Sequence, residues 1–148
     1  MNTFSKLFAL TMSGICLFTI LIPSVMDVND THMTNPLWTP HARFHWAIQY
    51  LSATLMSILA LLLLWLQYKE KRSLLSIFFI GFSPLMFWGM FFPALLMPGT
   101  GTWPDGVNAP ASFPELFKII HPNFIMAAVI TPISVVVTLR EYRMAKRI

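Results

Sequence analysis

Residues 46–68 read WAIQYLSATLMSILALLLLWLQY and contain no charged side chain. About 20 apolar residues in a helix are enough to cross the roughly 30 Å hydrocarbon core of a bilayer. Three other runs reach this length, at 7–26, 74–97 and 116–139, the last of which includes Lys118. Of the whole chain, 56% is hydrophobic and 11% is charged, whereas an ordinary soluble domain has about a quarter of its residues charged. The sequence therefore predicts an all-α integral membrane protein, a four-helix bundle, and excludes a water-soluble globule.

These runs take up nearly all of the apolar sequence, so we expect one polytopic membrane domain over residues 1–148. Its helices are predicted at about 7–26, 40–68, 74–97 and 114–139. The first run ends without the small-residue pattern of a cleavage site, which favours a retained helix over a signal peptide. The chain has one cysteine, Cys16, which excludes an internal disulfide, a CxxC redox pair and a cysteine zinc site.

The distribution of basic residues predicts the orientation. Cytoplasmic loops of membrane proteins carry an excess of Lys and Arg. In this chain one side of the predicted spans collects most of them: Lys6, Lys69, Lys71, Arg72, Arg140, Arg143, Lys146 and Arg147. We therefore expect both termini in the cytoplasm, segments 27–40 and 98–114 outside, and the lipid bilayer as the main partner. No nucleic-acid partner is expected, because no stripe of basic and aromatic residues is present.

Two helix starts and several bends are predicted locally. Thr39 before Pro40 is typical of an N-cap followed by the first helical residue. Ser112 and Glu115 have the spacing of a capping box at the start of the last helix. Prolines inside membrane helices bend the axis and free a carbonyl, and a pair of them can open a cavity between helices. The last two predicted helices each contain two prolines: Pro84, Pro93, Pro122 and Pro132.

Histidines gather at the predicted outer side, and all four of them lie there: His32, His41, His45 and His121. His41 and His45 are four residues apart, so their rings project from one helix face, and Gln49 continues that face one turn deeper. Three interpretations stay open: interfacial or hydrogen-bonded histidines, acid–base catalysts, and ligands of a metal or haem. No Glu stands between the pair, which excludes a metalloprotease of the H-E-x-x-H type.

Two further positions suggest chemistry at this side. Arg43 keeps its charge at the head of a helix, so we expect it to pair with Asp27 or Asp30, with a substrate anion or a lipid headgroup as alternatives. His121 precedes a proline, which disfavours helical geometry at that residue. We therefore expect its ring at a distorted point that faces the bundle, where an ionisable group is a functional candidate.

Residues 35–45 read NPLWTPHARFH. This segment resembles the N-P-x-W-x-P-H-A-R-F-H signature of a group of small four-helix membrane proteins, in which it opens the second helix. More distantly, the order of one helix, an acidic outer loop, a Pro-Trp segment and three helices is similar to the sterol-isomerase and sigma-2-receptor superfamily. That resemblance implies an amine or a sterol held among helices by intramembrane acids. The second and third predicted helices of this chain depart from the pattern because they carry no acid.

Our leading hypothesis is an outward-facing pocket that binds or transforms a small lipophilic molecule. Whether the protein is an enzyme, and which cofactor it would use, stay open. The alternatives are a metal- or haem-binding redox protein, with the four histidines as ligands, and a structural subunit of an oligomer or larger membrane complex. We expect the rings of His45 and His121 to meet across the second and fourth helices. The catalytic candidates are His45, His121 and His41, and the ligand-binding candidates are Arg43, Asp27, Asp30, His32, Asn35, Trp38, Gln49, Asn123 and Glu115.

Overall fold

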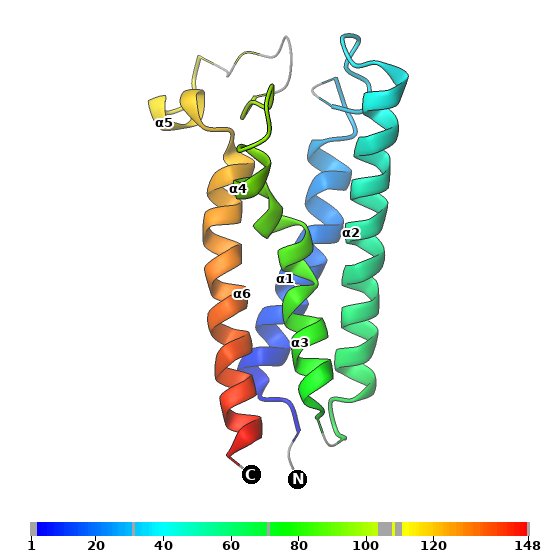
Figure 1. The fold of residues 1–148 in the computed structure, drawn as a ribbon, viewed down its shortest axis with the longest axis vertical. Coiled ribbons are helices and arrows are strands. Elements are labelled where there is room, and N and C mark those ends of the chain that lie inside the picture. Colours follow the sequence, from blue (N-terminus) through cyan, green and yellow to red (C-terminus); the bar gives the residue numbers. More distant parts are fainter. Residues whose placement is uncertain (1–2, 31, 71, 104–107, 109–110, 148) are drawn as a thin grey trace.

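The computed structural model describes residues 3–30, 32–70, 72–103, 108 and 111–147, and over these ranges the chain is helical, with no strand. The all-α prediction is confirmed. Three helices are long and apolar enough to cross a membrane: α1 (Lys6–Met26), α2 (Pro40–Leu66) and α6 (Pro122–Lys146). They run side by side, and both ends of the chain lie at the same end of the bundle (Figure 1). We call this the inner end and the opposite one the outer end.

The third predicted span is broken. It consists of α3 (Leu74–Phe82), the 3-10 turns η1 (Pro84–Met86) and η2 (Trp88–Met90), and the short helix α4 (Phe91–Ala94). Its two parts are bent by 49°. The break begins at Pro84, because proline lacks the N–H that would bond to the preceding turn. Counted as one bent span, this segment brings the number of candidate spans in the described chain to four.

The fourth predicted span is interrupted near its start. A short helix α5 (Glu115–Ile119) is followed by Ile120 in an extended conformation, and α6 begins only at Pro122. The prediction of a continuous helix from residue 114 is therefore wrong, because Pro122 forces the residue before it out of helical geometry. The capping box is also wrong, since Pro114 caps α5 without a side-chain bond, and Glu115 pairs with Lys118 at 2.6 Å.

The start of the second helix agrees with the predicted N-cap at Thr39. Thr39 is the N-cap of α2 and Pro40 its first residue, and the Thr39 hydroxyl accepts the backbone N–H of Ala42 at 3.2 Å. A proline costs nothing at this position, because the first helical N–H has no partner within the helix. The cap places His41 and His45 on the first turns of α2.

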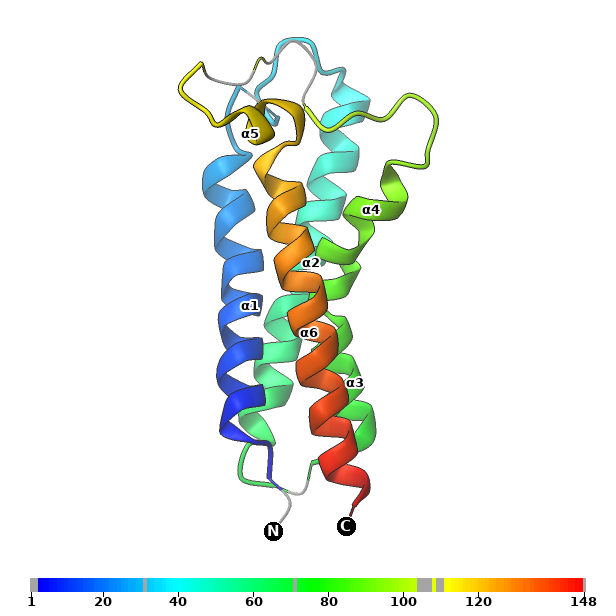
Figure 2. The same cartoon turned by 90° about the vertical axis from the view of Figure 1, so that its left-hand side faces the viewer.

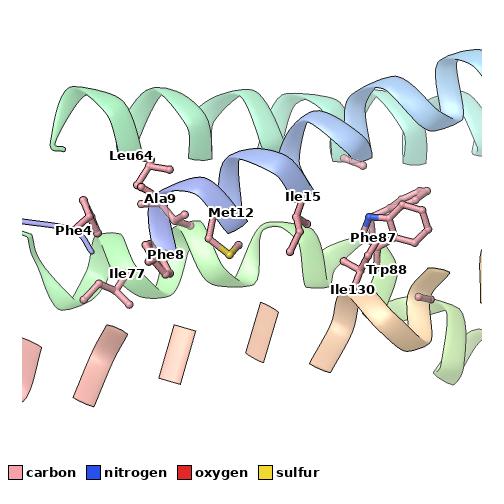
Figure 3. Close-up of a cluster of buried hydrophobic side chains, with 13 residues drawn as sticks. Phe4, Phe8, Ala9, Met12, Ile15, Leu64, Ile77, Phe87, Trp88 and Ile130 are labelled. Atoms are coloured by element: carbon pink, nitrogen blue, oxygen red, sulfur yellow. The ribbon is translucent and has the colours of Figure 1, made fainter. Parts of the chain in front are cut away.

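Helix α1 lies against the other helices and carries much of the core (Figures 2 and 3). In its most apolar stretch 39% of the residues are buried, against 22% for α2 and α6. Phe8 and Met12 are fully buried and belong to one cluster with Leu64 of α2 and Ile77 of α3. Large apolar side chains on the outside of the bundle, such as Leu62, remain exposed. This is the distribution expected of helices that face lipid.

Trp88 connects the broken third span to α1 by a hydrogen bond. Its side chain is 1% exposed, and its indole N–H donates to the Thr19 hydroxyl of α1 at 2.8 Å. The ring stacks on Phe91 and contacts Phe87 edge to face. A buried indole N–H without a partner would be costly, so this bond fixes the broken segment against α1.

The inner end is closed by a buried ion pair. Glu141 of α6 is fully buried and accepts from the Arg72 guanidinium, from the Ser5 amide at 2.9 Å and from the Ser5 hydroxyl at 2.6 Å. Arg72 also donates to the Thr3 carbonyl at 3.0 Å. The pair therefore joins the chain start, the link between α2 and α3, and the end of α6.

Helices α3 and α6 pack closely at Gly81. A Cβ built on this glycine would lie 2.1 Å from the Thr138 hydroxyl oxygen and 2.8 Å from its Cβ. No real Cβ fits at such distances, so the two helices pack here only because residue 81 has no side chain. Small residues at helix contacts allow this kind of close approach.

Candidate functional site

A cavity of about 680 Å³ opens at the outer end. Its lining residues place it where α1 ends and where α2 and α6 begin, beside α4. Helix α4 diverges from the axis of α3 (Figure 2). Seven aromatic residues form much of its wall: Trp38, Trp46, Tyr50, Phe87, Phe91, Trp103 and Phe124. Its lining residues on the long helices all belong to their outer parts, so the cavity does not extend to the inner half of the bundle.

Asp27 and His32 face each other in this cavity. Asp27 is 7% exposed, and His32 Nδ1 lies 3.7 Å from Asp27 Oδ1, too far for a hydrogen bond. Burial raises the pKa of Asp27 to about 6, and burial together with His121 lowers the pKa of His32 to about 4. Above pH 6 only Asp27 is charged, and below pH 4 only His32 is charged. Both shifts therefore disfavour the doubly charged form of this pair.

His121 caps α6 with its own ring. Its Nδ1 accepts the backbone N–H of Asn123 at 3.3 Å, which requires an unprotonated Nδ1. The neutral ring therefore carries its proton on Nε2, and burial lowers its pKa. The ring contacts Trp103 edge to face, with centroids 4.7 Å apart, and lies 6.2 Å from His32. Trp103 Nε1 is buried without a hydrogen-bond partner in the described part of the chain.

His45 pairs with His41 and not with His121. The Nε2 atoms of His45 and His41 are 3.0 Å apart, and both side chains are exposed. Our prediction that the rings of His45 and His121 meet is wrong, although both residues line the same cavity. His121 stands outside its helix at the cap, where its ring lies against Trp103 and His32, while His41 is one helical turn from His45.

The predicted ion pair of Arg43 with Asp27 or Asp30 is also wrong. Arg43 donates from Nη2 to the carbonyl of Asn35 at 2.9 Å, while Asp30 accepts from the Thr34 hydroxyl at 2.7 Å. Asn35 is 2% exposed, and its side chain accepts the Leu37 amide at 2.9 Å. Arg43 therefore attaches the first outer loop to α2 through a backbone carbonyl exposed by the turns of that loop.

The structure brings together only part of the predicted set. Seven of the predicted residues line the cavity: Asp27, His32, Trp38, His45, Gln49, His121 and Asn123. Five lie outside it: Asp30, Asn35, His41, Arg43 and Glu115. Sequence reasoning missed most of the aromatic wall. Phe91 and Phe124 lie next to Pro93 and Pro122, so the proline pairs were a usable signal for this region.

Among the described residues, no three His, Cys, Asp or Glu side chains form a group that could hold a metal ion. The four histidines instead form two pairs, His41 with His45 and His32 with His121. Comparisons of the chain with protein-family models, curated proteins and solved structures found no match.

Proposed function

We propose that this chain is a four-helix membrane protein, with both termini in the cytoplasm, that binds a small lipophilic molecule in the outer cavity. The main support is a cavity of about 680 Å³ that combines an aromatic wall with a few buried polar groups. Binding sites for small molecules typically measure about 300–1,000 Å³ and have this mixture of apolar lining and sparse polar groups.

The bundle geometry supports four spans. Because both termini lie at the same end (Figure 1), an even number of crossings is needed, which is met if the bent segment from α3 to α4 counts as one span. Basic residues of the inner end, such as Arg72 and Arg143, support a cytoplasmic location for that end.

The polar groups of the cavity indicate what the ligand carries. His121 has a donor at Nε2, and Trp103 has an indole N–H that no described group accepts. A ligand with a carbonyl or hydroxyl oxygen on an apolar body would satisfy both donors. Its body would pack on Phe91 and Phe124, which contact each other edge to face at 5.2 Å. In a reaction, His45 and His121 would be the proton-transfer groups, since both line the cavity and an imidazole nitrogen can accept or donate a proton.

Copurified small molecules provide the direct test. We would purify the protein in detergent, extract it with solvent and identify the bound molecules by mass spectrometry against a detergent blank. Ala42→Trp and Ala94→Trp fill the cavity and should each lose most of the bound molecule. Ile48→Trp is the matched control, because Ile48 is 46% exposed on α2 and does not line the cavity. Equal retention by all three variants would overturn the proposal, and a haem absorption band would favour the redox alternative.

Cysteine labelling tests the orientation separately. In a Cys16→Ala background, Asn108→Cys should react with an impermeant maleimide from outside the cell. Glu70→Cys, which lies in the exposed link after α2, should react only after the cells are opened. The reverse pattern would contradict the orientation and leave the cavity itself unaffected.

A further inference from the structure

A second groove, of about 550 Å³, lies on the outside of α6 toward the inner end. Successive lining residues are one or three positions apart in the sequence, so they form one stripe along a single helix face. The stripe is lined by Val136, Leu139, Arg140, Arg143, Met144 and Arg147. Between the first and last of these the helix rises about 16 Å.

No described residue covers this face. The buried residues of α6, among them Ser134, Thr138 and Glu141, belong to the opposite side of the helix. Val136 is 63% exposed and Leu139 is 42% exposed. The stripe is apolar nearer the middle of the bundle and cationic at the end of the helix, which matches the passage from hydrocarbon to headgroups.

Within the described part of the chain, no acidic side chain forms an ion pair with the arginines of this stripe. The one acid of α6, Glu141, is buried on the other face and is engaged by Arg72. The ion pairs among the described residues involve Asp27, Glu115 and Glu141, and none includes an arginine of the stripe. Guanidinium groups present planar forks of N–H donors that match phosphate oxygens.

We propose that this groove binds an anionic phospholipid of the inner leaflet. Its phosphate lies against the arginines at 140, 143 and 147, and one acyl chain follows Val136 and Leu139. The inference rests on the membrane orientation in the proposed function, but not on the outer cavity. A soluble phosphate compound would use only the arginines, whereas a phospholipid also uses the apolar part of the stripe. Nucleic acid is disfavoured because the apolar side chains of Val136 and Leu139 offer it no polar partner.

Lipid titration followed by native mass spectrometry tests this. The purified protein would be titrated in detergent with phosphatidylglycerol and with phosphatidylcholine of the same acyl chains. We expect a preference for phosphatidylglycerol of about tenfold or more, since each arginine near an anionic lipid contributes favourably. The variant Arg140→Gln/Arg143→Gln/Arg147→Gln should lose this preference. Val136→Ser/Leu139→Ser should weaken binding of both lipids.

Controls separate the outcomes. Lys6→Gln/Lys69→Gln removes charge from the same end of the bundle but not from the groove, and should leave the preference unchanged. A thermal unfolding curve and the amount of copurified cavity ligand report whether the arginine variant is folded. The proposal fails if the lysine variant loses the preference equally. It also fails if millimolar inorganic phosphate or an oligonucleotide displaces the lipid, because the acyl chain would then contribute nothing. The cavity variant Ala42→Trp should still bind phosphatidylglycerol.

Discussion

At the inner end, the buried Glu141 carboxylate accepts from Arg72 and from two donors of Ser5. At the outer end, Trp103 Nε1 is buried without a partner among the described residues, in the wall of an open cavity. Helix packing also differs between the two ends. Helices α3 and α6 touch closely at Gly81, whereas the bend turns α4 off the axis of α3 and leaves it in contact with α6 through Phe91 and Phe124. Unpartnered buried polar atoms also occur in the inner half, Arg72 Nε and Thr138 Oγ1 among them. The contrast therefore lies in the Glu141 carboxylate, whose donors all belong to the chain, and in the open cavity of the outer end.

This contrast suggests that stability and binding are located in different halves of the bundle. A buried ion pair contributes to stability only if its hydrogen bonds are complete, because removing charges from water is costly. The inner pair meets that condition on the carboxylate side. In the cavity, the indole N–H of Trp103 has no hydrogen-bond partner within the described chain. A site that completes its hydrogen bonds with a ligand needs such a free donor. Changes at the inner end should therefore affect folding most.

The largest effect is expected from breaking the inner ion pair. Glu141→Leu leaves the buried Arg72 guanidinium without its carboxylate, and Arg72→Leu leaves the carboxylate buried without its cation. Each should lower the free energy of unfolding by about 3–5 kcal/mol, measured by titration with a denaturing detergent in mixed micelles. The double variant Arg72→Leu/Glu141→Leu removes both charges and should be more stable than either single one. Single variants as stable as the unmodified protein would contradict the contrast between the two ends.

A smaller loss is expected at the contact between α3 and α6. Gly81→Ala adds a Cβ where the Thr138 side chain already lies, so the helices must move apart, at a cost of about 1–3 kcal/mol. The same detergent titration measures it. Thr138→Gly in the Gly81→Ala background makes room and should restore part of the loss. Gly14→Ala is the control, since nothing lies within 4 Å of a Cβ at that position.

The smallest effect is expected from pH at the outer end. His32, with its pKa lowered to about 4, and His121 stay neutral in the fold while they would protonate near pH 6.5 in the unfolded chain. Their contribution to stability is therefore present above about pH 6.5 and is lost as the pH falls toward 4. Asp27 opposes this, because its raised pKa makes the fold more stable as the pH falls from about 6 to 3.8.

As the pH falls, the two histidines destabilise the fold and Asp27 stabilises it, so we expect a modest net loss of folding stability. The midpoint of thermal unfolding should be a few degrees lower at pH 5 than at pH 7. His32→Gln should reduce this difference, and Asp27→Asn should enlarge it by removing the opposing group. If instead Asp27→Asn abolished the pH dependence, the aspartate and not the histidines would dominate the electrostatics of the cavity.

The sequence predicted the features that depend on near neighbours. The helices from residues 7 and 40, the cap at Thr39 and the distortion at His121 follow from runs and motifs within a few positions. Contacts between segments far apart in the sequence could not be predicted in this way. Arg72 and Glu141 are 69 positions apart, so the sequence showed only two charges expected on the same side. Arg43 bonds to a backbone carbonyl, for which side-chain types give no signal.

The hydrogen bond between Trp88 and Thr19 bears on how a molecule could reach the cavity. The cavity reaches inward to Phe87 and Phe91, and behind these rings Trp88 is held to Thr19 by its indole N–H. Within the described part of the chain, the lining of the cavity ends at these rings on its inner side. Under the proposed function, a bound molecule would therefore enter and leave at the outer end. The residence time of a bound molecule would then be set by movements of the outer loops, while the inner half of the bundle stays closed.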